Sequence, residues 1–343
     1  MESPPTCSCR VAYLPDPVKI DSEPGYPPPA VRALLESEPD ITCETITVAS
    51  LLAGCLLERE FSVLCIPGGF APNYAQRLGL EGLALIQAFV RDGGGFVGLC
   101  AGAYLGSSAC LSLLPVEVLD MHRWARGCGP CQLAFTHLAS RTLGALGPAS
   151  LLTVRYANGP LLQISAALPH DTETQRSEGA TPTSGDASES PGVLRCAFPL
   201  AHYATEVGAT VLGSSFPPIM AGSPAAVVGS YGAGLVLLAS PHFEDGEDER
   251  SLTPFRNFFR FCSRDSPYQT WCLGGLPLSQ LAAAVAADAR VGSEGPAVPP
   301  QTCRSPQDAF VKATVSDTLV PLNVFSSHWD GRVVELGVFG ETS

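Results

Sequence analysis

A glycine-rich stretch at residues 93–107, GGGFVGLCAGAYLGS, constrains the fold of this chain more than any other feature. Apolar residues before Cys100 predict a short buried strand, and a helix is predicted directly after it. Gly98 and Gly102 flank the cysteine, as a sharp strand-to-helix turn requires, because only small neighbours avoid a clash there. Such a turn exposes the Cys100 side chain above the sheet, at the positive end of a helix dipole that favours the thiolate. The same residues are also compatible with a cysteine that only packs in the core.

Strands and helices alternate along the first half of the chain. This order predicts a doubly wound α/β fold, with a mostly parallel sheet, right-handed crossovers and helices on both faces. The strands are expected at residues 10–14, 43–48 and 61–67 and, directly before Cys100, at Phe96, Val97 and Leu99; the helices are expected at 30–36, 49–57 and 81–91. The second half adds further expected strands at 115–119, 131–137, 151–156, 225–231 and 234–240, and a helix at 252–262.

The composition supports one large domain with additional segments. The chain has 343 residues, of which 45% are hydrophobic and only 15% charged, so a substantial core can form. We expect a disordered N-terminus at 1–9, one domain at 10–264, and a loosely structured tail at 265–343 with a helix at 278–287. Residues 170–192 are rich in Ser, Thr, Glu and Gly, and are predicted to form a disordered loop within the domain.

Charge and cysteine usage exclude several classes of partner. The net charge of −13 disfavours binding to nucleic acids and to anionic membranes. No apolar run reaches the about 18 residues that a membrane span needs, and the first ten residues lack the apolar core of a secretory signal. The 13 cysteines show no disulfide rhythm, so we expect free thiols in a cytoplasmic protein.

Five segments together resemble the class I glutamine amidotransferase-like superfamily. Within it, the chain is most similar to the amidotransferase-like domain at the N-terminus of some eukaryotic biotin–protein ligases. The segments are IPGGFAPNY (66–74), VRDGGGFVGLCAGAYLGS (90–107), HRWARGCGP (122–130), YANGP (156–160) and GSPAAVVGSYGAGLVLLASPHFE (222–244). The resemblance covers residues 10–264 and implies a flavodoxin-like sandwich that carries a Cys-His-Glu triad.

Cys100, His242 and Glu244 match the catalytic positions of that family. The residues give an independent reason for the pair, because positions two apart on an extended segment after the strand at 234–240 face the same side. The carboxylate can then orient the imidazole. Phe243 stands where many amidotransferases have proline. Without the resemblance, the favoured interpretation of His242 is a solvent-facing residue at the start of an acidic loop.

The predicted oxyanion hole consists of backbone N–H groups. Ala101 follows the nucleophile, and Gly69 or Phe70 lies on the double-glycine turn, where glycine permits close approach of a substrate. Six residues are candidates for substrate binding, although simple packing or an Asn-Gly turn also explains them. These are Tyr74, Tyr104, Trp124, Arg126, Asn158 and Gly159.

Cys128 and Cys131 form a Cys-x-x-Cys motif, for which we expect no redox role. A redox motif of this kind begins a helix, whereas a strand-like run follows here. Zinc would need two further ligands at suitable spacing, and Cys7 and Cys9 are a poor second half. We therefore predict neither a metal nor a cofactor.

The sequence favours hydrolysis of an amide C–N bond through a thioester on Cys100. The expected partner is a small-molecule amide, and the sequence identifies no protein partner. Two alternatives remain: a non-catalytic binding or regulatory module of the biotin–protein ligase N-terminal type, and a thiol redox sensor. The chain has no GRGR-type biotin-activation loop, so we do not expect ligase activity.

Overall fold

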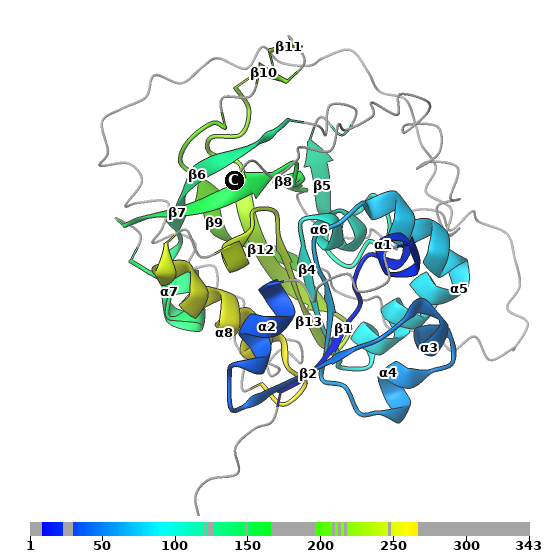
Figure 1. Cartoon of the computed structure of the whole chain (residues 1–343). Coiled ribbons are helices and arrows are strands. Elements are labelled where there is room, and N and C mark those ends of the chain that lie inside the picture. The colour runs from blue at the N-terminus through cyan, green and yellow to red at the C-terminus, as the bar shows by residue number, and fades with distance from the viewer. Residues whose placement is uncertain are drawn as a thin grey trace, which may run out of the picture. The chain divides into compact units, whose positions relative to one another are not determined.

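A nine-stranded sheet lies at the centre of the computed structural model (Figure 1), in the order β2-β1-β3-β4-β13-β12-β9-β6-β7. Strands β2, β1, β3, β4 and β13 run parallel, whereas β12, β9, β6 and β7 extend the sheet with antiparallel pairs. The strands are β1 (Cys9–Tyr13), β2 (Ile41–Thr45), β3 (Val63–Ile66), β4 (Gly95–Leu99), β6 (Cys128–Phe135), β7 (Leu151–Ala157), β9 (Cys196–Tyr203), β12 (Pro224–Tyr231) and β13 (Gly234–Ala239). The expected α/β fold class is confirmed, and the extra strands of the second half enlarge the same sheet.

The chain divides into two units, residues 1–297 and 298–343, and every described residue belongs to the first. The structure describes residues 9–22, 30–119, 121, 126–147, 150–165, 196–207, 210–211, 214–215, 218–245 and 248–266. The predictions for residues 1–8, for the loop at 170–192, for the helix at 278–287 and for nearly all of the tail at 265–343 lie outside these residues. Within them, no helix combines the length and the apolar character needed to cross a membrane.

Helices cover both faces of the sheet and produce two cores (Figure 1). One core contains α2 (Ala30–Glu36), α7 (His137–Leu143) and α8 (Leu252–Cys262), and its centre is a group of phenylalanines from α8. The other contains α3 (Val48–Leu52), α4 (Cys55–Glu58), α5 (Ala71–Arg91) and α6 (Ala101–Gly106). Because both faces are covered, every residue of β3, β4 and β13 is buried, as is typical of central parallel strands.

Glycines account for two differences between predicted and observed helices. Gly54, at φ 90°, divides the expected helix at 49–57 into α3 and α4, because its left-handed conformation ends one helix before the next begins. Helix α5 begins at Ala71, ten residues earlier than predicted, and it contains a break at Gly79, with φ 60° and ψ −175°. The predicted helix at 81–91 is thus the second half of a longer element.

Several elements of the second half were absent from the prediction. Strand β9 pairs with both β12 and β6, strand β8 (Leu161–Ile164) pairs with β5 (Val116–Leu119), and helix α7 replaces the end of the strand expected at 131–137. Thr136 ends β6 and caps α7 through its hydroxyl, which accepts the Ala139 N–H at 3.3 Å. The remaining elements are short. They are the helix α1 (Pro17–Ser22), the paired strands β10 (Thr210–Val211) and β11 (Ser214–Ser215), and the 3₁₀ turns η2 (Phe243–Asp245) and η3 (Glu249–Ser251).

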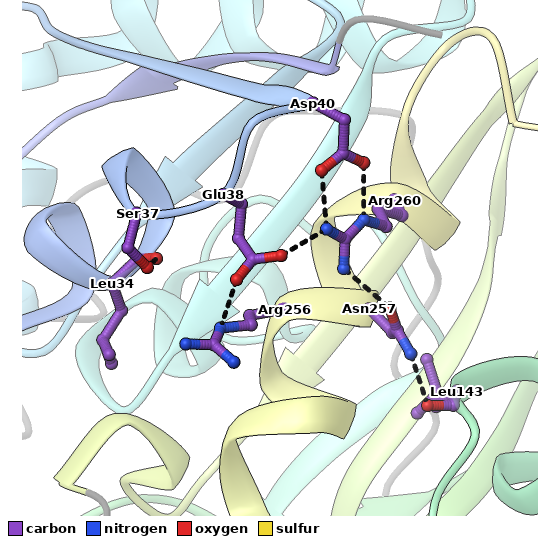
Figure 2. A network of polar contacts seen from close by, with 8 residues as sticks. All are labelled: Leu34, Ser37, Glu38, Asp40, Leu143, Arg256, Asn257 and Arg260. Atoms are coloured by element: carbon purple, nitrogen blue, oxygen red, sulfur yellow. Dashed lines mark hydrogen bonds and ion pairs between the residues drawn. The ribbon is translucent and has the colours of Figure 1, made fainter. Parts of the chain in front are cut away.

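An arginine on α8 connects this helix to the loop between α2 and β2 (Figure 2). The Arg260 guanidinium binds Asp40 through two bonds, at 2.7 and 2.6 Å, and donates to Glu38 at 2.6 Å. Asn257, one turn earlier, accepts from Arg260 at 3.0 Å and donates to the Leu143 carbonyl of α7 at 2.7 Å. The contacts of Arg260 with Glu38 and Asp40 join residues more than 200 positions apart, so they hold α8 against the first half of the sheet.

We expect Arg260→Lys to lower the free energy of unfolding by about 1–2 kcal/mol, because lysine cannot make the two-bond contact with Asp40. Urea denaturation of the purified chain measures the change.

Arg250→Lys is the matched control, since Arg250 is exposed and its partner Asp248 lies only two residues away, and little change is expected there. The Arg260 hydrogen bond lowers the pKa of Asp40, so the Asp40 contribution is present above its unfolded pKa of about 3.9 and is lost as the pH falls further. The difference between wild type and Arg260→Lys should accordingly narrow below about pH 4; a constant difference would contradict this assignment.

Candidate functional site

Four adjacent parallel strands bring the candidate residues to one edge of the sheet. Asp16 follows β1, Gly68 follows β3, Cys100 follows β4 and His242 follows β13. These strands are neighbours in the sheet, and parallel strands present their carboxyl ends at the same edge. Ligands of open α/β sheets bind at this edge, outside the carboxyl ends of the strands.

Cys100 occupies a strained turn between β4 and α6. Its backbone has φ 48° and ψ −99°, a conformation that a non-glycine residue rarely adopts. A Cβ on Gly102 would lie 2.0 Å from the Ile66 carbonyl oxygen, and a Cβ on Gly98 would lie 2.4 Å from that of Gly102. The two glycines are therefore required for this turn, as the sequence predicted. The Cys100 N–H donates to the Ala239 carbonyl at 2.8 Å, which connects the turn to the end of β13.

The partly buried His242 and the buried Glu244 form a pair beside this turn. The Nδ1 atom of His242 lies 2.7 Å from Oε1 of Glu244, whose side chain is only 7% exposed. The reason given from the sequence is incorrect, because residues 243–245 form the 3₁₀ turn η2 rather than an extended segment. Phe243 is fully buried between Phe135 and Phe258, and this anchor leaves the side chains on either side of it free to meet.

The surroundings of His242 favour its protonated form. Burial lowers the pKa of His242, but hydrogen bonds to Cys100 and Glu244, together with electrostatic attraction by both groups, outweigh this and raise the pKa to about 11. The contact with Glu244 therefore favours a proton on the imidazole. His242 can donate one N–H to Glu244 and direct the other ring nitrogen at Cys100.

The double-glycine turn lies directly against this group. A Cβ on Gly68 would be 3.0 Å from Cε1 of His242 and 3.8 Å from Cβ of Cys100. The next residues correct one prediction: the Phe70 N–H donates to Oδ2 of Asp16 at 3.0 Å, so it is already bonded and does not serve as an oxyanion donor. Gly69 remains the candidate donor of this turn. Ala101 is the first residue of α6, where a helix has no internal acceptor for its N–H.

The turn at residues 157–160 covers Cys100 from the antiparallel half of the sheet. The Sγ atom of Cys100 donates to the Ala157 carbonyl at 3.5 Å, and the His242 N–H donates to the Arg155 carbonyl at 2.8 Å. A Cβ on Gly159 would lie 2.3 Å from the Ser240 carbonyl oxygen, so glycine permits this close approach. Strand β7 is last in the strand order of the sheet. Its end nevertheless lies beside the end of the central strand β13, because Arg155 of β7 forms a bridge with His242.

The remaining predicted substrate residues have different surroundings. Tyr104 is 4% exposed and interacts electrostatically with Cys100, Tyr156 and the buried Arg126. Burial raises the pKa of Tyr104 well above its usual range, so its hydroxyl stays neutral. Tyr74 is fully buried, with its hydroxyl 3.4 Å from the Gly68 carbonyl oxygen, and its role in substrate binding stays a prediction. Trp124 lies outside the described residues.

Asn158 has a structural partner that explains its position. Its Oδ1 atom accepts the Gly127 N–H at 2.6 Å, and its own N–H donates to the Gly127 carbonyl at 3.0 Å. This reciprocal pair holds Asn158 at φ 53° and ties the 157–160 turn to the start of β6. Asn158 therefore shapes the wall beside Cys100 through the backbone rather than by a free side chain.

Two other groups of potential ligands lie in the described part of the chain. His242, Glu244 and Asp245 present ligand atoms within 4.8 Å of one another, but Nδ1 of His242 is already bonded to Glu244. Cys128 and Cys131 lie inside strand β6, with the first exposed and the second buried. Residues three apart on a strand point to opposite faces, so this geometry does not resemble a helical redox motif.

Asp16, Asn73 and Ala157 belong to the candidate site but were not identified from the sequence. The only sequence signal for Asp16 is its position in a Pro-Asp-Pro segment after the first strand, which is typical of an ordinary turn. Ala157 contributes only a carbonyl, which sequence patterns do not report.

We expect Glu244→Gln to lower the pKa of His242, because a neutral amide neither attracts the imidazolium nor accepts its proton as strongly. An NMR titration of the imidazole, assigned with a His242→Asn variant, measures the change. Since the pKa of His242 is raised in the folded state, its stabilising contribution is full below the unfolded value of about 6.5 and is lost as the pH rises through about 11. Glu249→Gln removes an exposed acid from the same loop and is expected to leave the titration unchanged. An unaltered His242 titration in Glu244→Gln would show that the pairing does not control its charge.

Residues 26–118 match the family model described as biotin-protein ligase, N terminal. This range contains the double-glycine turn and Cys100 but not His242 or Glu244. The chain is also 30% identical over 196 residues to an uncharacterized protein of Chlamydia muridarum (strain MoPn / Nigg). That alignment covers 55% of this chain and 62% of the chlamydial protein, so the chain spans less than two thirds of its length.

Solved structures give only distant similarities. A structure of PurLQS from Thermotoga maritima has a TM-score of 0.45 and 13% identity, covering 74% of this chain and 99% of the other. The structure of SMU.1228c has a TM-score of 0.37 and 15% identity, covering 80% and 99%. A cold-adapted β-galactosidase from Rahnella sp. R3 has a TM-score of 0.33 and 16% identity, covering 73% of this chain and 30% of the other.

Proposed function

We propose that this protein is a cysteine-dependent hydrolase of the amidotransferase type, which cleaves an amide C–N bond. The observation that carries the proposal is the close association of the strained Cys100 with His242: both side chains lie against Gly68, and His242 is hydrogen-bonded to the buried Glu244. Each group has the role that nucleophilic catalysis requires: a nucleophile, a proton carrier and a carboxylate that orients the carrier. The family match over residues 26–118 supports the proposal, because it includes the predicted nucleophile.

The raised pKa of His242 determines how the reaction begins. In the proposed reaction the Cys100 proton, which the thiol donates to the Ala157 carbonyl in this structure, passes to His242, and the sulfur attacks the amide carbonyl carbon as a thiolate. The tetrahedral intermediate collapses when its C–N bond breaks, and His242 donates its proton to the leaving nitrogen, which departs as ammonia or an amine. Water then attacks the thioester, His242 accepts its proton, and the carboxylic acid product leaves as the sulfur regains its negative charge.

Backbone N–H groups stabilise the negative oxygen of both tetrahedral intermediates in this proposal. Ala101 supplies one group from the first turn of α6, and Gly69 supplies the other from the turn that contacts His242 and Cys100 through Gly68. Each such donor is worth about 10²–10³ in rate. The substrate class is a small amide such as glutamine, because Cys100 is only 7% exposed and is enclosed by Tyr104 and the 157–160 turn.

The covered position of Cys100 also favours a second candidate function, a ligand-binding module without turnover. The Cys100 sulfur is bonded to the Ala157 carbonyl, and this contact must open before a substrate reaches it. A binding module of the biotin–protein ligase N-terminal type would keep Cys100 covered by this contact. The thiol-sensor hypothesis has less support, since Cys128 is exposed whereas Cys100 is not.

Labelling with iodoacetamide and with a chloroketone analogue of glutamine, read by mass spectrometry, tests these functions. We expect Cys100 to be modified at neutral pH, and His242→Asn to slow its modification at least about 100-fold. Cys128→Ala is the matched control for loss of a thiol, because it removes an exposed cysteine and should leave both modification of Cys100 and amide hydrolysis unchanged.

Ammonia release from glutamine and a panel of small amides is measured with the same variants. Hydrolysis that Cys100→Ala abolishes supports the enzyme, whereas ligand binding without ammonia release supports the binding module. Equal labelling of wild type and Cys100→Ala would sink the nucleophile assignment altogether.

A further inference from the structure

Asp16 is a buried carboxylate that the proposed reaction does not use. It lies directly after β1, between Pro15 and Pro17, and is 3% exposed. A buried carboxylate is costly unless its oxygens are hydrogen-bonded, so its partners indicate its role.

The partners of Asp16 lie on two separate segments. Oδ2 accepts the Phe70 N–H at 3.0 Å, and the Asn73 side-chain amide lies within 3.1 and 3.2 Å of the two oxygens. Oδ1 also accepts the Val18 N–H at 3.0 Å and lies 3.5 Å from the Lys19 N–H. Asp16 therefore caps α1 and, from 54 residues away in sequence, holds the turn after β3.

The double-glycine turn is shaped around this carboxylate. A Cβ on Gly69 would lie 3.0 Å from Oδ2 and 3.1 Å from Cβ of Asp16, and Gly69 has φ 149°. Only glycine satisfies both conditions. On the other side of the same turn, a Cβ on Gly68 would meet His242 at 3.0 Å. The turn is thus confined between Asp16 and the Cys100–His242 pair.

We infer that Asp16 is a positioning residue for the oxyanion hole; this inference rests on the proposed function. By fixing the Phe70 N–H, the carboxylate fixes the orientation of the peptide after Gly69. Because Asp16 also packs against Gly69 itself, it restricts φ and ψ of Gly69 and thereby the direction of the Gly69 N–H, which the proposed reaction uses. The negative charge of Asp16 is directed at its own N–H partners, so it can lie near the oxyanion site without opposing the reaction.

The inference distinguishes two reactions of Cys100. Acylation by p-nitrophenyl acetate passes through a tetrahedral oxyanion, whereas alkylation by iodoacetamide is a direct displacement at carbon and forms none. A residue that only positions the oxyanion donor affects the first reaction alone. A residue with a general structural role, or one that alters the thiolate, affects both.

The experiment compares the full-length wild type with Asp16→Asn, which preserves size but leaves one acceptor oxygen where two are used. We expect acylation of Cys100 to slow about ten-fold or more and alkylation to change less than two-fold. Asp92→Asn, which alters an exposed acid at the end of α5, is the matched control and should change neither rate. Loss of both rates together in a folded Asp16→Asn protein, or no loss of acylation, would overturn the inference.

A second variant covers the case in which Asp16→Asn does not fold. Asn73→Ala removes one partner of Asp16 and retains the Phe70 bond, so a smaller but selective loss of acylation, about three-fold, is expected. An unchanged ratio of acylation to alkylation in Asn73→Ala then overturns the inference. If wild-type Cys100 reacts with neither reagent, the proposed function fails and this inference falls with it. If wild-type Cys100 reacts with both reagents but the Asp16 and Asn73 variants leave the ratio of acylation to alkylation unchanged, this inference alone is refuted.

Discussion

The backbone conformation of Cys100 is the constraint on which the candidate site depends. A residue at φ 48° and ψ −99° is held there only if its surroundings leave no alternative, at a cost of about 1–3 kcal/mol. Here the restraints are the contact of Gly102 with the Ile66 carbonyl, the contact of Gly98 with Gly102, and the bond from Cys100 to Ala239. Each restraint comes from β3, β4 or β13. The turn at Cys100 therefore keeps its geometry only when these three strands are neighbours in the sheet.

Much of the parallel half of the sheet and of the turn at Cys100 could be predicted from local sequence. The Gly-x-Cys-x-Gly frame indicated the turn at Cys100, and alternating strands and helices indicated the parallel half of the sheet. His242 and Glu244 were placed at the correct strand end, because a buried strand followed by polar residues marks the carboxyl edge of such a sheet. Their geometric explanation was wrong, since a 3₁₀ turn anchored by Phe243 is not visible in the pattern of polar and apolar residues.

The parts that escaped prediction depend on contacts between distant segments. β9 pairs with β12 and β6 across breaks in the described chain, and no local periodicity reports such partners. The close approach of Ala157 to Cys100 depends on this antiparallel half, as does the bond between Arg155 and His242. Asp16 escaped for the same reason, because a Pro-Asp-Pro turn carries no sign that its carboxylate will bind the backbone of Phe70.

The two buried carboxylates of this edge illustrate a difference between holding a structure and performing chemistry. Asp16 has N–H partners on both oxygens, so its burial fixes two turns without leaving a polar atom unsatisfied. Glu244 has its Oε1 on His242, but its buried Oε2 has no hydrogen-bond partner among the described residues, a situation that costs about 1–3 kcal/mol. A carboxylate with fewer competing donors interacts more strongly with the imidazole, which agrees with the raised pKa of His242. Glu244 thus lowers the stability of the fold, at a position where the proposed chemistry needs a strong hydrogen-bond acceptor. Asp16 has all its hydrogen bonds made, at a position where the proposed chemistry needs a rigid carboxylate.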